Sequence, residues 1–459
     1  MSGLYTKIIS NLIFPLHERL KSHTTVTVRE ELERTQWWSK RDLEKLQLNR
    51  LRELLIHARH HVPYYTRLFS GISFDPALIA SLGDLSRLPL LTKSEIRVHL
   101  EQLKADNACD LARFNTGGSS GEPLIFYIGK KRVSHDVAAK WRATRWWDVD
   151  IGDREIVLWG SPIELNAQSR TRAFRDTLLR TELLPAFEMS EPKLNGFLKK
   201  ICAVRPHMLF GYPSSLAHLA CHAQANNVRM DNLGIKVAFV TSERLYNDQR
   251  KQIEMVFGCR VANGYGGRDA GFIAHECPSG GMHITAEDII VEIVDEQGMP
   301  LSPGVSGEVV VTHLATNDFP FIRYRTGDVA ILDDQMCSCG RSLPLIREIQ
   351  GRTTDFIIAS DGTVMHGLAL IYVVRDLPGV KQFKIIQESM SATRIFLVID
   401  SGFHESLIAR IKSDVMQRLG QDVRVDVEIV PYIAKEASGK YRYVTSHVLS
   451  PGIKKSAQS

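Results

Sequence analysis

The chain has 459 residues, of which 44% are hydrophobic, 24% charged and 8% aromatic. These globular values exclude a disordered, collagen-like or coiled-coil chain, and the length predicts about three domains, or one large and one small domain. The net charge of +5, from 57 basic and 52 acidic residues, is too small and too dispersed to predict a nucleic-acid partner.

The N-terminal segment, residues 4–20, holds an apolar patch that is broken by Lys7 and Pro15. It is too short to span a bilayer and has no small-residue cleavage site, and no other run is long enough to predict a membrane span. We expect a packed helix here, and a peripheral amphipathic contact with a membrane is left open. The seven cysteines are mostly isolated, which favours a reducing, cytoplasmic setting over a disulfide framework.

The first hundred residues are predicted to be helical. Apolar positions recur at helical spacing in Leu43–Ala58, and Pro63 ends this helix because proline lacks the N–H that a helix interior needs. Thr92 and Glu95 have the spacing of a capping box and predict the start of a further helix.

From about residue 110, short apolar runs alternate with polar, periodic stretches. This alternation is typical of parallel β–α–β units whose sheet is covered on both faces. The predicted strands are 154–160, 207–212, 235–240 and 259–266, and the predicted helices are 214–224 and 246–257.

The remaining chain changes texture twice. Residues 284–334 are rich in β-formers separated by Gly and Pro turns, which predicts an antiparallel or barrel-like β subdomain. After residue 352, strands alternate with two helices near 367–376 and 403–419, which predicts a small α+β domain. The sequence therefore predicts an α/β protein with the following parts: an N-terminal domain 1–351 (helical lead-in 1–109, α/β core 110–283, β subdomain 284–351) and a C-terminal domain 352–459.

A Gly-rich loop at residues 115–123, NTGGSSGEP, combines three glycines with three hydroxyl side chains. Its backbone N–H groups and hydroxyls suit phosphate oxygens, although no Gly–Lys–Ser/Thr follows and it is therefore not a Walker A loop. Taken alone, a flexible surface turn is the simpler interpretation.

Two turns carry further polar groups. Residues 265–269, YGGRD, come just after residues 259–263 of a predicted strand, and open α/β sheets bind ligands at such strand ends. Tyr265 could stack on a base and Asp269 could hold Mg²⁺. Residues 323–328, RYRTGD, place Asp328 where it could accept hydrogen bonds from ribose, and their two arginines could reach phosphate or carboxylate. A surface ion pair and a charged hairpin end are the alternatives. Lys440 alone is an ordinary surface lysine.

A cluster of metal-ligating residue types is also present. Cys277, His283, Cys337 and Cys339 could complete a tetrahedral zinc site that clamps two loops, with His275 as a substitute ligand. The single residue between the last two cysteines is a tighter spacing than in usual zinc knuckles. Free cysteines near the rim of an active site are the alternative.

These segments occur in the order and spacing of the adenylate-forming superfamily. The chain most closely resembles the phenylacetate–coenzyme A ligase family and its CapK-like branch, which is often associated with polysaccharide biosynthesis. The motifs that carry the resemblance are HVPYY (61–65), DLSRLPLLTKSEIR (84–97), TGGSSGEP (116–123), FGYPSSL (210–216), TSERLY (241–246), NGYGGRDAG (263–271), RYRTGD (323–328), CSCGR (337–341), GRTTDFI (351–357) and SGKYR (438–442).

The resemblance implies a large N-terminal domain, a small mobile C-terminal domain and a two-step reaction. A carboxylate would attack the α-phosphate of ATP, with Mg²⁺, to give an acyl-adenylate and pyrophosphate, and a thiol, most often that of coenzyme A, would displace AMP. An amine or a carrier protein as acceptor, in polysaccharide or natural-product biosynthesis, is the alternative.

By motif position, the resemblance also implies roles for individual residues. For ATP and catalysis they are Thr116, Ser119 and Ser120 on the phosphates, Tyr265 with Gly266 at the adenine, Ser242 and Glu243 shaping the adenine pocket, Asp328 on the ribose with Arg352 beside it, Asp269 at magnesium, and Lys440 bridging the α-phosphate and the carboxylate. For the acyl pocket they are Tyr212, Pro213 and Gly267.

Three positions depart from the family's pattern. Glu122 stands where many members have Lys, Asp269 where most have Glu, and Thr354 where many have an acidic residue. These departures motivate a second hypothesis, a catalytically reduced nucleotide-binding scaffold that docks a partner through a zinc-clamped surface. Retention of Lys440 and Asp328 favours the enzyme. Whether the chain forms a homodimer is left open.

Overall fold

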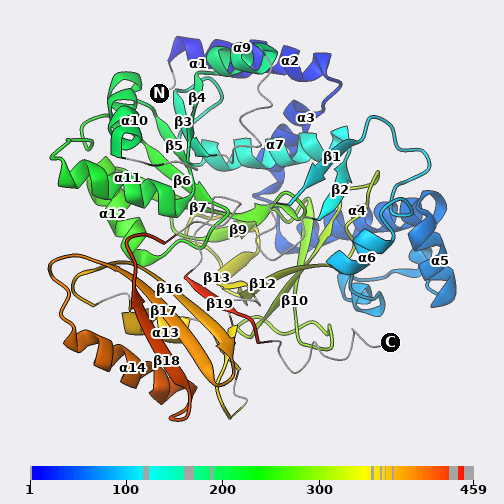
Figure 1. Ribbon diagram of the computed structural model, residues 1–459. Coiled ribbons are helices and arrows are strands. Elements are labelled where there is room, and N and C mark those ends of the chain that lie inside the picture. The colour runs from blue at the N-terminus through cyan, green and yellow to red at the C-terminus, as the bar shows by residue number, and fades with distance from the viewer. Residues whose placement is uncertain are drawn as a thin grey trace. The chain divides into compact units, whose positions relative to one another are not determined.

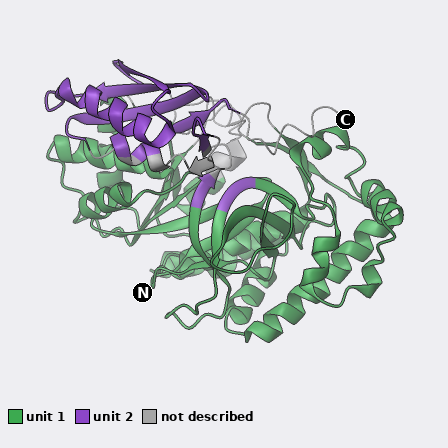
Figure 2. Ribbon diagram, turned by 90° about the horizontal axis from the view of Figure 1, so that it is seen from below, with its two compact units in different colours: residues 1–326, 330–349 green, residues 327–329, 350–459 purple. Residues whose placement is uncertain are grey.

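The structure, a computed structural model, describes residues 3–116, 124–159, 170–186, 189, 191–352, 356–361, 364–366, 368–374, 377–433 and 443–448 (Figure 1). The chain divides into two compact units (Figure 2). The first comprises residues 1–326 and 330–349, and the second comprises residues 327–329 and 350–459. The predicted domains 1–351 and 352–459, as parts that fold separately, stay a prediction.

The first unit is built on one long mixed sheet, which confirms the α/β fold class. In spatial order its eleven described strands are β10 (Ile289–Val294), β11 (Ser306–His313), β12 (Tyr324–Asp333), β13 (Leu345–Arg352), β9 (Met282–Ile284), β8 (Gly271–Glu276), β7 (Arg260–Gly267), β6 (Val237–Thr241), β5 (Met208–Gly211), β3 (Glu155–Trp159) and β4 (Thr181–Pro185).

The strands of the sheet run in parallel from β4 to β7 and in antiparallel from β7 through β8 and β9 to β13. The β-rich region predicted at 284–334 is present, and its pair β10–β11 is antiparallel. Its strands continue the same hydrogen-bonded sheet, however, and do not form a separate one.

Helices make up most of the rest of this unit. In chain order they are α1 (Leu4–Ile8), the π-helix η1 (Ile9–Ile13), α2 (Phe14–Leu20), α3 (Thr25–Thr35), α4 (Lys40–His61), α5 (Pro63–Gly71), the short 3₁₀ turns η2 (Pro76–Leu78) and η3 (Leu82–Arg87), α6 (Lys93–Val98), α7 (Lys130–Arg145), α9 (Arg170–Leu179), α10 (Glu191–Val204), α11 (Pro213–Ala225) and α12 (Asn247–Phe257). A hairpin of β1 (Ala112–Asn115) and β2 (Ile125–Ile128) forms a separate sheet.

Both faces of the parallel strands are covered, as the sequence predicts. In β5, Leu209 packs into the cluster made with α10, α11 and α12, whereas Met208 and Phe210 pack into a second cluster with the end of α7. Successive side chains of a strand point to opposite faces, so this alternation requires an apolar cover on each side. The amino- and carboxyl-end loops are then the parts of these strands that remain free for polar side chains.

The helix boundaries follow local chemistry. Ser39 caps α4 by accepting a hydrogen bond from the Asp42 N–H at 3.2 Å, and the helix ends directly before Pro63. The predicted capping box is confirmed at α6, where the Thr92 N–H donates to Glu95 Oε2 at 2.7 Å and the Glu95 N–H donates to Thr92 Oγ1 at 3.2 Å.

The second unit is a small α+β fold, as predicted. Its main sheet has the order β18 (Arg424–Ile429), β17 (Ala392–Ile399), β16 (Val380–Ser389), β19 (Val444–Ser446). The other elements are the hairpin β14 (Phe356–Ile358) and β15 (Val364–His366), and the helices α13 (Leu368–Val374) and α14 (Ser406–Leu419). Buried Ile385, Leu397 and Val415 belong to its core.

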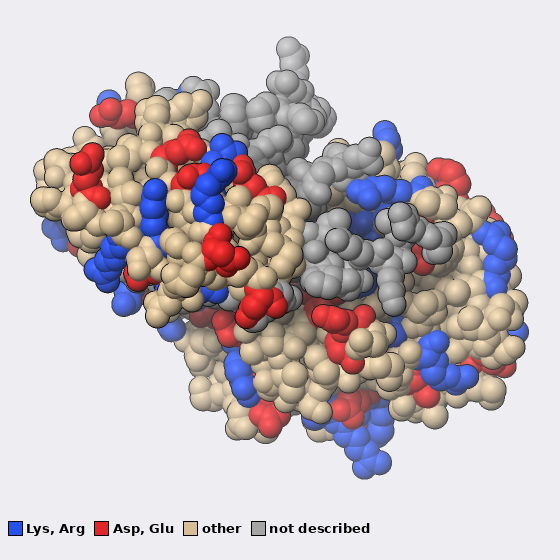
Figure 3. All heavy atoms as spheres, turned by 60° about the horizontal axis from the view of Figure 1, so that its bottom comes forward, with Lys and Arg blue, Asp and Glu red and all other residues tan. Residues whose placement is uncertain are grey.

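Charges of both signs are mixed on the face of the molecule that Figure 3 draws. On the face in Figure 3, the Lys and Arg side chains of the described residues are interspersed with those of Asp and Glu. Among the described residues on this face, Figure 3 shows no extended patch of a single sign. Among the described residues, none of the helices combines the length and the apolar character needed to cross a bilayer.

One arginine of the RYRTGD segment supports the fold and does not reach outward. The Arg323 side chain is 2% exposed; it pairs with Glu292 Oε1 at 3.0 Å and donates to the carbonyls of Leu88 and Gly298 at 2.6 and 2.7 Å. Of the two partners expected for this arginine, phosphate or carboxylate, the structure shows a carboxylate, that of Glu292. Arg325, which is 39% exposed, pairs with Glu308.

We expect Arg323→Met to lower the free energy of unfolding by about 3–5 kcal/mol, because it leaves the buried Glu292 carboxylate without its cation. Burial already raises the pKa of Glu292. Arg325→Met is the matched control and should cost at most about 1 kcal/mol, because its ion pair is half-exposed. Urea unfolding followed by tryptophan fluorescence measures both values. Equal losses in the two variants would contradict the structural role of Arg323.

Candidate active site

The carboxyl ends of three adjacent parallel strands meet at one edge of the sheet. Gly211 at the end of β5 pairs with Val240 of β6, and Thr241 at the end of β6 pairs with Gly264 of β7. The predicted residues 212–213 and 242–243 directly follow β5 and β6, and residues 265–269 comprise the last three residues of β7 and the start of the turn after it. Open α/β sheets bind ligands at such carboxyl ends, so the three motifs share the expected place.

The segment after β5 joins an aromatic stack to a helix start. The Tyr212 ring stacks on Trp159 with centroids 4.3 Å apart, and Pro213 is the first residue of α11. Proline suits this position because its missing N–H would have no helical partner. Both residues are buried, so the predicted acyl pocket would have Tyr212 in a fixed orientation.

The segment after β6 is tied to this helix start. Glu243 Oε2 accepts a hydrogen bond from the Ser214 N–H, at 3.2 Å, in the first turn of α11. A carboxylate is favoured there by the unpaired N–H groups and the helix dipole. The preceding residue, Ser242, has a φ of +70°, an uncommon conformation for a residue other than glycine. The fold thus holds this segment in a defined conformation between β6 and α11.

Two glycines at the carboxyl end of β7 permit close contacts with the turn that follows. A Cβ on Gly266 would lie 2.2 Å from the Gly271 carbonyl oxygen, and one on Gly267 would lie 2.7 Å from Asp269 Oδ1. The β7–β8 register shifts between Tyr265 and Gly267. At Gly266 the neighbour is backbone, so only glycine fits there, whereas at Gly267 the neighbour is the Asp269 carboxylate, which lies back against the end of the strand.

The Asp269 carboxylate has a partner that the sequence did not predict. The buried Tyr324 hydroxyl in β12 donates to Asp269 Oδ2 at 2.6 Å, and the Ala270 N–H donates to Oδ1 at 3.1 Å. Tyr324 fixes the orientation of a carboxylate that retains acceptor capacity for a metal or a donor. Its place inside the RYRTGD motif was the available signal. Asp328 lies further along β12, in the short segment grouped with the second unit.

Of the Gly-rich loop, the structure describes the base. Thr116 and Leu124 face each other there: the Thr116 N–H donates to the Leu124 carbonyl, and the Leu124 N–H donates to Thr116 Oγ1, both at 3.0 Å. Ser119, Ser120 and Glu122 lie outside the described residues, as do Thr354 and Lys440. Of Arg352, only the backbone at the end of β13 is described.

The four predicted zinc ligands lie together. The ligand atoms of Cys277, His283, Cys337 and Cys339 are all within 4.8 Å of one another. Cys277 Sγ is 3.6 Å from Cys337 Sγ, and Cys339 Sγ is 3.2 Å from His283 Nε2. Tetrahedral Zn²⁺ with Zn–S bonds of 2.3 Å needs sulfur atoms about 3.8 Å apart, so this donor set fits the ion. His275 is not part of the group.

The chemistry of these side chains also suits a metal. Burial lowers the pKa of His283 to about 4, so the ring is neutral, and its Nδ1 lies 3.4 Å from the Leu343 carbonyl, which leaves Nε2 for a metal. Burial raises the pKa of the Cys277 thiol to about 12. Burial opposes ionisation of Cys339 too, but hydrogen bonds from Arg341 hold its pKa below the ordinary value. A bound cation would ionise the remaining thiols.

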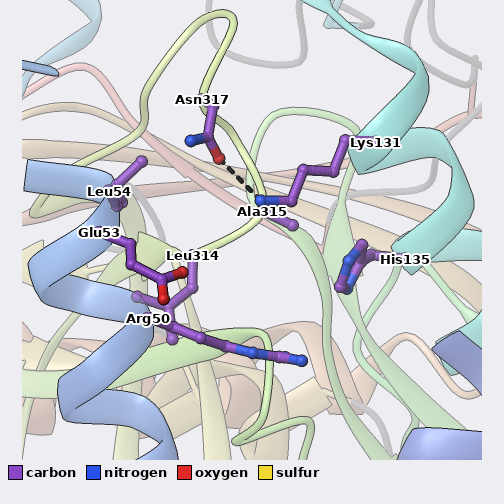
Figure 4. Close-up of a pocket in the computed structure, with 8 residues that line it drawn as sticks. All are labelled: Arg50, Glu53, Leu54, Lys131, His135, Leu314, Ala315 and Asn317. Atoms are coloured by element: carbon purple, nitrogen blue, oxygen red, sulfur yellow. Dashed lines mark hydrogen bonds between the residues drawn. The ribbon is translucent and has the colours of Figure 1, made fainter. Parts of the chain in front are cut away.

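A separate cavity lies away from these loops. Its volume is about 200 Å³, and Figure 4 shows Arg50 and Glu53 projecting from α4, with Lys131 of α7 donating to Asn317 at 3.0 Å. Beside it, His135 Nδ1 lies 2.7 Å from Asp288 Oδ1. None of its lining residues follows β5, β6 or β7, so this cavity is distinct from the candidate active site.

Comparison with known proteins first places the chain in a class. Its fold matches that of a crystal structure of 2-hydroxyisobutyryl-CoA ligase in the postadenylation state with R3-HIB-AMP, with a TM-score of 0.73 at 21% identity; the match covers 90% of this chain and 91% of the other. The chain therefore has the fold of adenylate-forming CoA ligases.

The sequence relatives indicate which proteins of this fold the chain resembles. The family model of the CapK C-terminal domain matches residues 357–447. Protein CapK of Staphylococcus aureus is 22% identical over 447 residues, 96% of this chain and 97% of its own length. A phenylacetate–coenzyme A ligase of Thermus thermophilus is 28% identical over 330 residues, 69% and 72% of the two chains. The resemblance inferred from the motifs is confirmed.

We expect the protein purified without chelator to contain about one equivalent of zinc per chain, and chelation to lower its melting temperature, because the ion would join the β8–β9 turn to the β12–β13 loop. Cys277→Ala should abolish zinc binding, whereas Cys259→Ala, which alters a buried cysteine outside the cluster, should keep it. Metal analysis and thermal unfolding measure the two effects. A zinc-free protein that still lacks zinc after reconstitution would contradict the prediction.

Proposed function

We propose that the protein is an ATP-dependent, AMP-forming carboxylate ligase. The observation that supports this most directly is the convergence of three motif segments at the carboxyl ends of β5, β6 and β7, with the Asp269 carboxylate oriented by Tyr324. The fold is that of a 2-hydroxyisobutyryl-CoA ligase crystallised in a postadenylation state, and a sequence relative is named as a phenylacetate–coenzyme A ligase.

The proposed reaction has two displacements. A carboxylate oxygen of the acid forms a bond to the α-phosphorus of ATP, and the bond from that phosphorus to the pyrophosphate oxygen breaks. The acceptor thiol then attacks the acyl carbon, the bond to the AMP oxygen breaks, and the thiol proton passes to solvent. Two anions must approach each other in the first step, so a fixed cation and oriented donors lower its barrier.

The residues divide these tasks by motif position. Asp269 would hold magnesium, which would neutralise charge on the phosphates, and Tyr324 would keep the carboxylate oriented. Lys440 would supply the cation between the α-phosphate and the attacking carboxylate. The other proposed contacts are Thr116, Ser119 and Ser120 with the phosphates, Tyr265, Gly266, Ser242 and Glu243 with the adenine, Asp328 and Arg352 with the ribose, and Tyr212, Pro213 and Gly267 with the acyl group.

Coenzyme A is the acceptor we favour. The Thermus relative and the 2-hydroxyisobutyryl enzyme are both named as CoA ligases, and the latter has been crystallised with CoA. An amine or a carrier protein remains the alternative acceptor, because CapK, which matches the greater length of this chain, carries no acceptor in its name.

Exchange of labelled pyrophosphate into ATP, without coenzyme A, tests the first step over a panel of aromatic, fatty, hydroxy and amino acids. We expect acid-dependent exchange, and we expect Lys440→Ala to reduce it by about 10²–10³-fold, the usual loss when one electrostatic group at the reacting centre is removed. Lys381→Ala, which removes an exposed lysine of the same unit, is the control.

Unchanged exchange in Lys440→Ala would contradict the role given to this lysine. ATP binding without exchange for any acid in the panel would instead favour the nucleotide-binding scaffold and contradict the ligase.

Tyr324→Phe should reduce the exchange rate about 10–100-fold, mainly by weakening the use of Mg²⁺, because the Asp269 carboxylate loses the hydroxyl that orients it. Raising the Mg²⁺ concentration should recover part of the loss. Tyr65→Phe, which removes a buried hydroxyl elsewhere in the first unit, should keep normal Mg²⁺ dependence. Equal Mg²⁺ profiles for all three proteins would rule out the positioning role.

A further inference from the structure

The N-terminal helix carries an exposed row of aliphatic side chains. Leu4, Ile8, Leu12, Leu16 and Leu20 recur every four residues along α1, η1 and α2, and each is between 43% and 79% exposed. Contiguous exposed apolar side chains on a soluble fold mark interaction sites. The row runs along a helix about 25 Å long, at 1.5 Å per residue.

The opposite side of this helix packs against the rest of the first unit. Thr6 Oγ1 donates to Asp153 Oδ1 at 2.8 Å, Phe14 packs edge-on against Trp141 at 5.1 Å between centroids, and Glu18 accepts from Thr25. A Cβ placed on Gly152 would lie 2.6 Å from the Ile9 Cβ, so the Ile9 side chain lies directly against this glycine. These contacts hold the helix with Ile9, Phe14 and Glu18 inward, and the exposed aliphatic row cannot reach the core without breaking them.

The π-helical turn η1 reduces the angular drift of the row around the helix. Side chains spaced by four residues drift by about 40° per step around an α-helix, because each residue turns about 100°. The turn η1, Ile9–Ile13, has i→i+5 geometry and so takes more residues per revolution. It offsets much of the drift, and the first and last leucines of the row stay on the outer side.

Basic side chains flank the row. Lys7, Arg19 and Lys21 are exposed, and none of them forms an ion pair with the residues that the structure describes. The acidic residue of this segment, Glu18, is buried and bonded to His23. Beside the helix, the Tyr5 hydroxyl of α1 donates to the Leu178 carbonyl of α9 at 2.8 Å, and Arg180, directly after α9, lies 3.6 Å from the centroid of the Tyr5 ring.

We propose that this face docks on the surface of a lipid bilayer that carries anionic head groups. An apolar stripe with flanking Lys and Arg side chains is the chemistry of a helix that lies in the plane of a membrane interface. A second copy of the chain fits less well, since one row of five aliphatic side chains offers less than the roughly 800 Å² per partner that a stable interface buries. The proposal does not depend on the ligase activity.

Flotation of the purified full chain with vesicles tests the proposal. We expect binding to phosphatidylcholine vesicles that contain about one third phosphatidylglycerol, weaker binding to pure phosphatidylcholine, and loss of binding as salt is raised. Leu12→Gln combined with Leu16→Gln should weaken binding at least about tenfold. Lys7→Glu combined with Lys21→Glu should abolish the preference for anionic vesicles.

The control is Leu78→Gln combined with Val98→Gln, which alters equally exposed apolar residues elsewhere in the first unit and should bind like the wild type. Circular dichroism and melting temperature should match in all variants because every altered side chain is exposed. Wild-type protein that stays with the soluble fraction, or binding unchanged in the leucine variant, would overturn the proposal. It would also be overturned by a wild-type dimer that becomes monomeric in the leucine variant without vesicle binding.

Discussion

The parallel pairing of β5, β6 and β7 is the constraint on which the candidate active site depends. Apolar side chains on both faces of these strands are covered by α7 on one side and by α10, α11 and α12 on the other. Polar side chains are thereby favoured at the strand ends. At this end of the sheet, Thr241 of β6 pairs with Gly264 of β7. The Glu243 bond to the start of α11 and the glycine turn before Asp269 follow from this arrangement.

Some buried polar side chains stabilise the fold, and others orient groups of the candidate active site. Arg323 is enclosed by Glu292 and backbone carbonyls. Its guanidinium group links Glu292 of β10 to the Leu88 carbonyl in the N-terminal region. Tyr324, the next residue, points its hydroxyl at Asp269. Arg323 directly precedes β12 and has a φ of +49°, so the chain turns there before the strand begins. One motif thus supplies a structural cation and a positioning group for the carboxylate.

The sequence predicted what depends on periodicity and on local rules. The strands predicted at 207–212, 235–240 and 259–266, the helix predicted at 214–224, the capping box at Thr92 and the proximity of the four zinc-type side chains are all found in the structure. Tyr324 as the partner of Asp269 was missed, since a contact across 55 residues has no local signature. The same reason explains Arg323: the motif showed a charged side chain but not the pocket of carbonyls that receives it.

The exposed aliphatic row at the N-terminus shows another limit of prediction from the sequence. The sequence predicted a packed helix, and Thr6 and Phe14 are packed, but the exposure of Leu12 depends on which side of the helix the remaining fold covers. Helical spacing alone assigns faces relative to one another and not relative to a core. The π-turn at Ile9–Ile13, which sets the direction of the row, likewise has no simple sequence signal.

Transfer of ¹⁸O from a labelled carboxylate tests adenylation most directly. The acid that supports pyrophosphate exchange would be supplied with ¹⁸O in its carboxylate, and AMP would be analysed by mass spectrometry after reaction with ATP and coenzyme A. If the carboxylate attacks the α-phosphorus, one labelled oxygen appears in AMP. Label in inorganic phosphate together with ADP, or the absence of acid-dependent AMP for every acid tested, would contradict an adenylate-forming ligase.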